Sequence, residues 1–85
     1  MNAAREKSVS DIREWLVARL SKKLAIPPGE IPADQPMSRL GIDSTEAVVI
    51  SGELQEWLGK RIAPTVVWDH PTIDDLAAYL AGGAD

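Results

Sequence analysis

The chain has 85 residues, of which 45% are hydrophobic and none is cysteine; this suits one small domain with a single core and excludes disulfides and thiolate metal sites. Its 13 acidic residues outnumber 9 lysines and arginines, which argues against a nucleic-acid-binding surface, since such a surface needs clustered basic residues. No apolar run approaches the roughly 20 residues of a membrane span, and the N-terminus lacks a signal-peptide apolar region, so we expect a soluble, cytoplasmic protein without a membrane partner.

The first helix is predicted to begin at Ser10 or Asp11, with Glu14 placed three residues after Asp11 for a capping box. It should end near Ala25, before a Pro-Pro-Gly segment. Its apolar residues recur at helical spacing: Ile12, Trp15, Leu16, Leu20 and Leu24. Residues 1–9 are expected to form a flexible N-terminal segment, residues 10–81 the domain, and residues 82–85 a C-terminal tail.

A long connection follows the first helix. Residues 26–40 contain four prolines and one glycine, which predicts an irregular crossover rather than a helix or strand. Ile31, Met37 and Leu40 are its expected core anchors. Unstructured connections longer than about 12 to 15 residues are uncommon in compact domains unless they are functional, so this one is expected to deliver a functional segment.

That segment is Gly41-Ile42-Asp43-Ser44-Thr45, at the start of the second predicted helix. Asp43 and Glu46 have the spacing of a capping box, which would satisfy the free amides of the first turn and release Ser44 from capping. The Ser44 hydroxyl would then face solvent beside backbone amides and the positive end of the helix dipole, an environment that favours an attached phosphate. The simpler alternative is that Ser44 is itself the N-cap and has no further role.

The second helix has two distinct faces. At about 100° per residue, one face gathers the expected core positions Ala47, Ile50, Leu54 and Leu58, with Trp57 at its flank. The opposite face carries Thr45, Val49, Gly52, Glu53 and Glu56, with Val48 nearer one edge. Residues 26–85 have a net charge of −7 and residues 1–25 a net charge of +3, which favours basic docking partners for this face. An ordinary solvated face is the alternative. Gly59 should end the helix.

Two further helices are predicted. Pro64 fits the first turn of a short helix that ends at Trp68. Thr72 can cap a last helix, where Asp74 and Asp75 suit the dipole and Gly82-Gly83 ends the element. Its apolar stripe is Ile73, Leu76, Ala77 and Leu80. The expected fold is therefore all-α, a small four-helix bundle with three longer helices, one short helix and a long first loop.

A catalytic role finds few residues to support it. His70 is the one histidine and lies between Asp69 and Pro71, where a turn is expected. The segment around Ser44 is not Gly-x-Ser-x-Gly, and so small a bundle leaves little room for a cleft and an oxyanion hole. Only scattered carboxylates remain for a metal. The sequence therefore predicts neither catalytic nor metal-binding residues, and a small hydrolase is a distant alternative.

Two motifs carry a resemblance to a known family. Gly41-Ile42-Asp43-Ser44 resembles the Gly-x-Asp-Ser attachment motif of acyl carrier proteins, and Trp68-Asp69-His70-Pro71-Thr72 resembles a segment of carrier domains from modular polyketide synthases. The resemblance spans about residues 12–80 and implies a four-helix fold with 4′-phosphopantetheine on Ser44. Thr45 replaces the usual Leu, Met or Ile, Val49 a common carboxylate, and Trp68 the common Phe.

The resemblance implies an acyl carrier, not an enzyme. Coenzyme A and a separate phosphopantetheinyl transferase would supply the arm, which would hold acyl or polyketide intermediates as thioesters for acyl-loading enzymes, a ketosynthase and other synthase enzymes. The isolated domain is expected to be a monomer. The expected partner surface lies on the second helix: Thr45, Glu46, Val49, Glu53 and Glu56. The leading alternative is an unmodified helical interaction module that uses the same acidic face.

Overall fold

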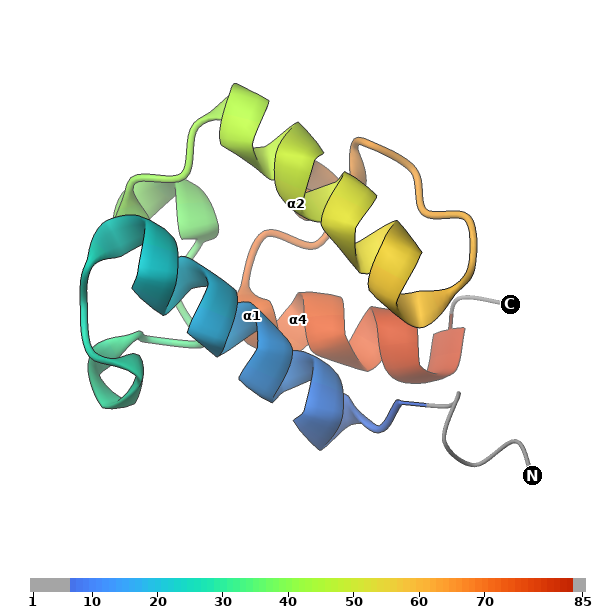
Figure 1. The fold of residues 1–85 in the computed structure, drawn as a ribbon, viewed down its shortest axis with the longest axis horizontal. Helices are drawn as coiled ribbons and strands as arrows, with labels where there is room; N and C mark the ends of the chain where they lie inside the picture. The colour runs from blue at the N-terminus through green and yellow to red at the C-terminus, as the bar shows by residue number, and fades with distance from the viewer. Residues whose placement is uncertain (1–6, 84–85) are drawn as a thin grey trace.

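The computed structural model describes residues 7–83 and confirms the all-α class. Its α-helices are α1 (Val9–Leu24), α2 (Ser44–Leu58), α3 (Val66–Asp69) and α4 (Ile73–Ala78). Helix α1 runs antiparallel to α2, and α4 packs against α1 (Figure 1). The start of α2 therefore lies at the end of the bundle that carries the α1–α2 connection, away from the start of α1 and the end of α4 (Figure 1).

Helix α1 begins earlier than the sequence analysis predicted. Ser8 is the N-cap, and its hydroxyl accepts a hydrogen bond from the Asp11 amide at 3.0 Å while the Ser8 amide donates to the Asp11 carboxylate at 3.1 Å. The capping box thus joins Ser8 to Asp11, not Asp11 to Glu14. The helix ends as expected, with Ala25 as a left-handed C-cap at φ 58°. Of the proposed flexible segment, residues 1–6 lie outside the described residues, whereas Ser8 and Val9 belong to the helix start.

The core confirms the predicted helical stripes. Fully or almost fully buried side chains come from all three longer predicted helices: Ile12, Leu16, Leu20, Ala47, Ile50, Leu54, Ile73, Leu76, Ala77 and Leu80. Trp15, Leu24, Trp57 and Leu58 are half-buried and pack against this core. The Trp15 and Trp57 rings stack with their centroids 5.4 Å apart, which ties α1 to the C-terminal part of α2.

The α1–α2 connection is more ordered than predicted. It contains two short 3₁₀ turns, η2 (Pro28–Glu30) and η3 (Met37–Leu40). Ile31 and Met37 are buried, as predicted, and Leu40 is half-buried. The Met37 amide donates to the Pro71 carbonyl at 2.8 Å, and the Asp74 amide donates to the Ala33 carbonyl at 3.0 Å. These bonds to the α3–α4 junction fix the loop that precedes α2.

The second half of the chain closes the bundle. Gly59 ends α2 in the left-handed region at φ 69°, as predicted. Helix α3 begins at Val66 with Thr65 as N-cap, so Pro64 lies before the helix rather than in its first turn. Thr72 caps α4 by accepting from the Asp75 amide at 3.0 Å, as predicted. A π-helical turn, η4 (Tyr79–Gly83), completes the described chain.

Within residues 7–83, no helix is long and apolar enough to cross a membrane. Residues 84 and 85 of the predicted C-terminal tail lie outside the described residues.

Candidate functional site

The site begins with a turn that only glycine adopts easily. Gly41 follows η3 as its C-cap at φ 107°, and its amide lies 3.3 Å from the Ser38 carbonyl. Any other residue would be strained at this φ, because side chains with a Cβ rarely adopt it. Its Cβ would also lie 3.4 Å from Leu24 Cδ2. Ile42 then turns into the core and is 4% exposed. The turn and this anchor place the next two residues at the surface.

Asp43 caps α2, as the sequence predicted. Its carboxylate accepts a hydrogen bond from the Glu46 amide at 2.8 Å, and its carbonyl accepts from the Ala47 amide at 2.9 Å. Ser44 is the first residue of the helix and is exposed. Among the hydrogen bonds of residues 7–83, none uses the Ser44 hydroxyl. Ser44 therefore contributes no cap, and its hydroxyl is available for modification.

The start of α2 suits a covalently attached phosphate. The first backbone amides of an α-helix have no acceptor within the helix. In α2 the Asp43 carboxylate accepts from the Glu46 amide, and the amides of Ser44 and Thr45 remain at the helix end. These amides and the positive end of the helix dipole favour a phosphodiester on the Ser44 oxygen. Both Ser44 and its neighbour Thr45 are exposed, so an attached group has room to extend into solvent.

Glu46 does not complete the predicted capping box. Instead of returning to the Asp43 amide, its carboxylate accepts a hydrogen bond from Arg19 of α1 at 2.6 Å and lies 3.7 Å from the Lys23 ammonium. Arg19 also donates to Glu53, which lies further along α2. The local charge of Arg19 and Lys23 outcompetes the backbone amide for Glu46, because ionic hydrogen bonds are the stronger ones.

The two carboxylates change the titration of the arginine. Hydrogen bonds to Glu53, and to a lesser extent Glu46, raise the pKa of Arg19 above its usual value, against the lowering effect of partial burial. Because the pKa of Arg19 is higher in the folded chain than in the unfolded chain, its charge stabilises the fold at every pH below the pKa of the unfolded chain. This stabilisation is lost only as the pH rises through the pKa of the folded chain. The guanidinium is therefore charged at every physiological pH.

The outward face of α2 is mixed. Val48 and Val49 are 44% and 43% exposed, and Thr45, Gly52 and Glu56 are exposed as well. The sequence placed Val48 nearer an edge of this face, whereas the structure exposes it as much as Val49. Side chains of the predicted partner surface differ in access: Glu53 is 44% exposed, but Glu46 is only 15% exposed.

Trp68 and His70, both from the second motif, lie in different environments. Trp68 of α3 is 52% exposed. His70 is the C-cap of α3, stacks on Tyr79 with ring centroids 4.1 Å apart, and places Nδ1 3.4 Å from Asp75 without forming a hydrogen bond. His70 therefore lies in the turn between α3 and α4, as predicted, and its contacts do not involve Ser44.

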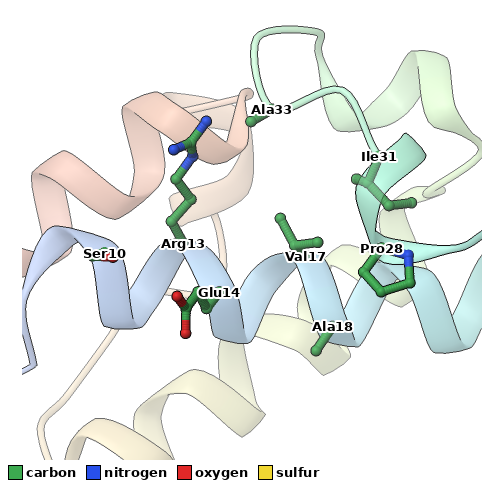
Figure 2. A pocket seen from close by; sticks show the side chains of 8 residues that line it. All are labelled: Ser10, Arg13, Glu14, Val17, Ala18, Pro28, Ile31 and Ala33. Carbon is green, nitrogen blue, oxygen red and sulfur yellow. The ribbon is translucent and has the colours of Figure 1, made fainter.

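A groove of about 400 Å³ lies between α1 and the α1–α2 connection (Figure 2). Val17 and Ile31 line it, and Arg13 at its edge reaches toward α4, where it forms an exposed ion pair with Asp74 at 2.9 Å. No residue of α2 contributes to this groove, so it is separate from Ser44. Within residues 7–83, no group of three or more histidine and carboxylate side chains is placed to hold a metal ion.

Comparison with known proteins identifies a family for this arrangement. Residues 14–80 match the family model described as "Phosphopantetheine attachment site". A phenolphthiocerol/phthiocerol polyketide synthase protein of Mycobacterium tuberculosis is 46% identical over 72 residues, which are 85% of this chain and 4% of that protein. Erythronolide synthase EryA3 of Saccharopolyspora erythraea is 31% identical over 83 residues, 96% of this chain and 3% of that protein. The chain thus spans only a few hundredths of the length of these relatives.

Solved structures share the fold. The acyl carrier protein Asl1650 from Anabaena, described as having a variant phosphopantetheinylation-site sequence, has a TM-score of 0.82 and 32% identity over 87% of this chain and 84% of its own. A free-standing peptidyl carrier protein from Acinetobacter baumannii has a TM-score of 0.83 and 29% identity over 92% of this chain and 98% of its own. The four-helix arrangement with one short helix is therefore that of carrier proteins.

Proposed function

The chain belongs to the family of phosphopantetheine-binding carrier proteins, and we propose that Ser44 is the residue to which its arm is attached. One observation carries this proposal: Ser44 is exposed at the first position of α2, while Asp43 serves as the cap. Modification of the Ser44 oxygen would therefore break no hydrogen bond of the fold. The exposed first turn supplies the amides and the dipole that favour the product.

Loading is a phosphoryl-group transfer that a separate phosphopantetheinyl transferase catalyses with coenzyme A. The Ser44 oxygen bonds to a phosphorus of the coenzyme A pyrophosphate, the pyrophosphate P–O bond breaks, the nucleotide leaves, and the serine proton passes to a base of the transferase. The contribution of this chain is to present the hydroxyl and to hold the first turn rigid. When bound, the arm supplies a terminal thiol that holds an acyl group as a thioester.

We further propose that synthase enzymes dock on the outward face of α2, at Thr45, Glu46, Val49, Glu53 and Glu56. The face adjoins Ser44, so a partner seated there would have its active site within reach of the arm. Val49 offers an apolar contact, and Glu56 an exposed charge for which residues 7–83 provide no ion-pair partner. A flexible tether raises the local concentration of its cargo at such a site.

The similarity to polyketide synthases supports polyketide intermediates as the cargo and acyl-loading enzymes and a ketosynthase as partners. These relatives are much longer proteins, and this chain aligns with only 4% and 3% of their length. Fatty acyl groups are the nearest alternative cargo, since they use the same thioester chemistry.

Intact-protein mass spectrometry tests the attachment residue. The purified chain is incubated with coenzyme A and a broad-specificity phosphopantetheinyl transferase, and it should gain one phosphopantetheine unit. Ser44→Ala should gain none, whereas the control Ser38→Ala, which alters another exposed serine nearby, should load like the parent. Loading of Ser44→Ala would refute Ser44 as the attachment residue. A parent that gains no mass would refute the carrier role and favour the unmodified interaction module.

A further inference from the structure

Arg19 connects α1 to two carboxylates of α2. Its Nη2 lies 2.6 Å from Glu46, and its Nε donates to Glu53. Nη2 also lies 3.5 Å from the second oxygen of Glu53. We name these three side chains the Arg19 cluster. Within residues 7–83, this is the one place where a single cation bridges two carboxylates.

The spacing of the carboxylates matches the shape of a guanidinium group. Glu46 and Glu53 stand seven residues apart, which is about two helical turns, so their side chains leave the same side of α2. Arg19 donates to Glu53 through Nε and Nη2, and Nη2 also donates to Glu46. A lysine has a single point charge and cannot hold both carboxylates in fixed directions. The cluster therefore needs arginine at this position.

Partial burial distinguishes this cluster from an ordinary surface ion pair. The Arg19 and Glu46 side chains are 18% and 15% exposed, whereas the Arg13–Asp74 pair is 53% and 49% exposed. Water screens the exposed pair, so that pair is expected to contribute little. Loss of Arg19 would instead leave the largely buried Glu46 carboxylate with Lys23, at 3.7 Å, as its remaining cationic partner.

Glu46 is held at both its backbone and its side chain. Its amide donates to the Asp43 cap at 2.8 Å, and its carboxylate is fixed by Arg19. Ser44 lies between the cap residue and Glu46 in the same turn, and its own side chain makes no hydrogen bond within residues 7–83. The direction in which the Ser44 hydroxyl points therefore depends on how well this turn is held, and the Arg19 cluster holds it against α1.

We propose that Arg19 is a positioning residue for the loading of Ser44: through Glu46 it keeps the first turn of α2 in the one orientation that a transferase accepts. This inference rests on the proposed role of Ser44. Without Arg19 the turn samples other orientations while the bundle stays folded. A transferase that accepts a fraction of these orientations binds with an apparent affinity reduced by that fraction. The effect thus falls on KM and not on kcat.

Steady-state loading kinetics of Arg19→Gln test the proposal, with Arg13→Gln as the matched control. Both changes remove one positive charge from α1 and break its ionic link to another helix: Arg19 contacts two carboxylates of α2, and Arg13 contacts Asp74 of α4. Only Arg19 reaches the turn of Ser44. At a temperature where circular dichroism shows both variants fully folded, KM of Arg19→Gln should rise about tenfold with kcat nearly unchanged, as for a tenfold smaller competent fraction. Arg13→Gln should stay within about twofold of the parent, and Arg19→Lys should be intermediate.

Amide hydrogen exchange of the free protein gives a second readout that no transferase influences. Exchange at the Glu46 and Ala47 amides should accelerate in Arg19→Gln relative to exchange at the Leu54 amide, because only the first turn loosens. Uniform acceleration at all three amides would mean that Arg19 acts on global stability, and this would overturn the proposal. The exchange measurement decides the matter also where Arg19→Gln is too poorly folded for the kinetic assay. Equal KM for Arg19→Gln and Arg13→Gln would overturn the proposal as well.

The controls separate this proposal from the one on which it rests. If the parent gains one phosphopantetheine unit and Ser44→Ala gains none, Ser44 is the attachment residue whatever Arg19 does. If Arg19→Gln then loads with the KM of Arg13→Gln, only the positioning role fails. A parent that does not load at all would instead refute the proposed function.

Discussion

Leu54→Ala should destabilise the fold strongly, because Leu54 lies at the centre of the buried face of α2 and is 0% exposed. The change removes three carbon atoms from the core, which costs about 2.4 kcal/mol at 0.8 kcal/mol per buried methylene. A cavity term adds to this loss where the surroundings cannot collapse. Here they are held on both sides: the Arg19 cluster ties α2 to α1, and Gln55 accepts a hydrogen bond from the Ile62 amide at 2.9 Å.

We therefore expect a loss of about 3 to 4 kcal/mol, within the range of roughly 2 to 5 kcal/mol measured for such truncations. Domains of this size have a total stability of roughly 4 to 13 kcal/mol, so the variant would keep a fraction of it or unfold. The corresponding decrease in Tm is about 12 to 30 °C.

Urea titration followed by circular dichroism measures this loss, and the fluorescence of the stacked Trp15 and Trp57 gives an independent probe of the α1–α2 contact. Val49→Ala is the matched control, since Val49 lies on the same helix and is 43% exposed. Its change in stability should stay within about 0.5 kcal/mol. A loss below about 1 kcal/mol for Leu54→Ala, or equal losses for both variants, would show that the buried face of α2 is assigned incorrectly.

Three further predictions concern the ends and the outer face of the helices. Asp43→Ala should cost about 1 kcal/mol in urea titration and Ser44→Ala almost nothing, because only Asp43 caps α2; equal losses would contradict this assignment. Ala25→Gly should stabilise the domain by about 0.5 kcal/mol, since glycine relieves a left-handed C-cap at φ 58°, and a lower Tm would speak against it. Val49→Asp should slow acyl transfer at both low and high salt, whereas Glu56→Lys should mainly flatten the salt dependence with a basic partner; unchanged rates for both with every partner would leave this face without a docking role.

The helices and their buried faces could be predicted because periodicity is a local signal. A repeat of 3.6 residues identifies the inward positions of each helix, and Leu16, Leu54 and Leu76 are all fully buried. The cap at Asp43 was predictable for the same reason. The start of α1 was not, because Ser8 with Asp11 and Asp11 with Glu14 both have capping-box spacing. Ser8 is the observed cap, and this lengthens the helix.

Long-range contacts account for what the sequence could not predict. Nothing local indicates that the Met37 amide donates to the Pro71 carbonyl, although this bond helps to order the loop before Ser44. Glu46 shows the same limit, because its position favours a capping box until α1 brings Arg19 within 2.6 Å. The position of the Ser44 hydroxyl at the surface was predictable from its neighbours, but what holds its turn depends on a side chain from another helix.

Folding also redistributes the charge that partners meet. In the sequence, basic residues concentrate before residue 26 and acidic residues after it. In the structure, Arg13, Arg19 and Lys23 of α1 each pair with a carboxylate of α2 or α4. Arg19 and Lys23 of α1 thus neutralise part of the negative charge of α2. Salt screens mainly the charge that remains exposed. Docking beside Ser44 should therefore depend less on salt than the sequence charge implies, and the exposed side chains of Val48 and Val49 should supply a larger share of the binding energy.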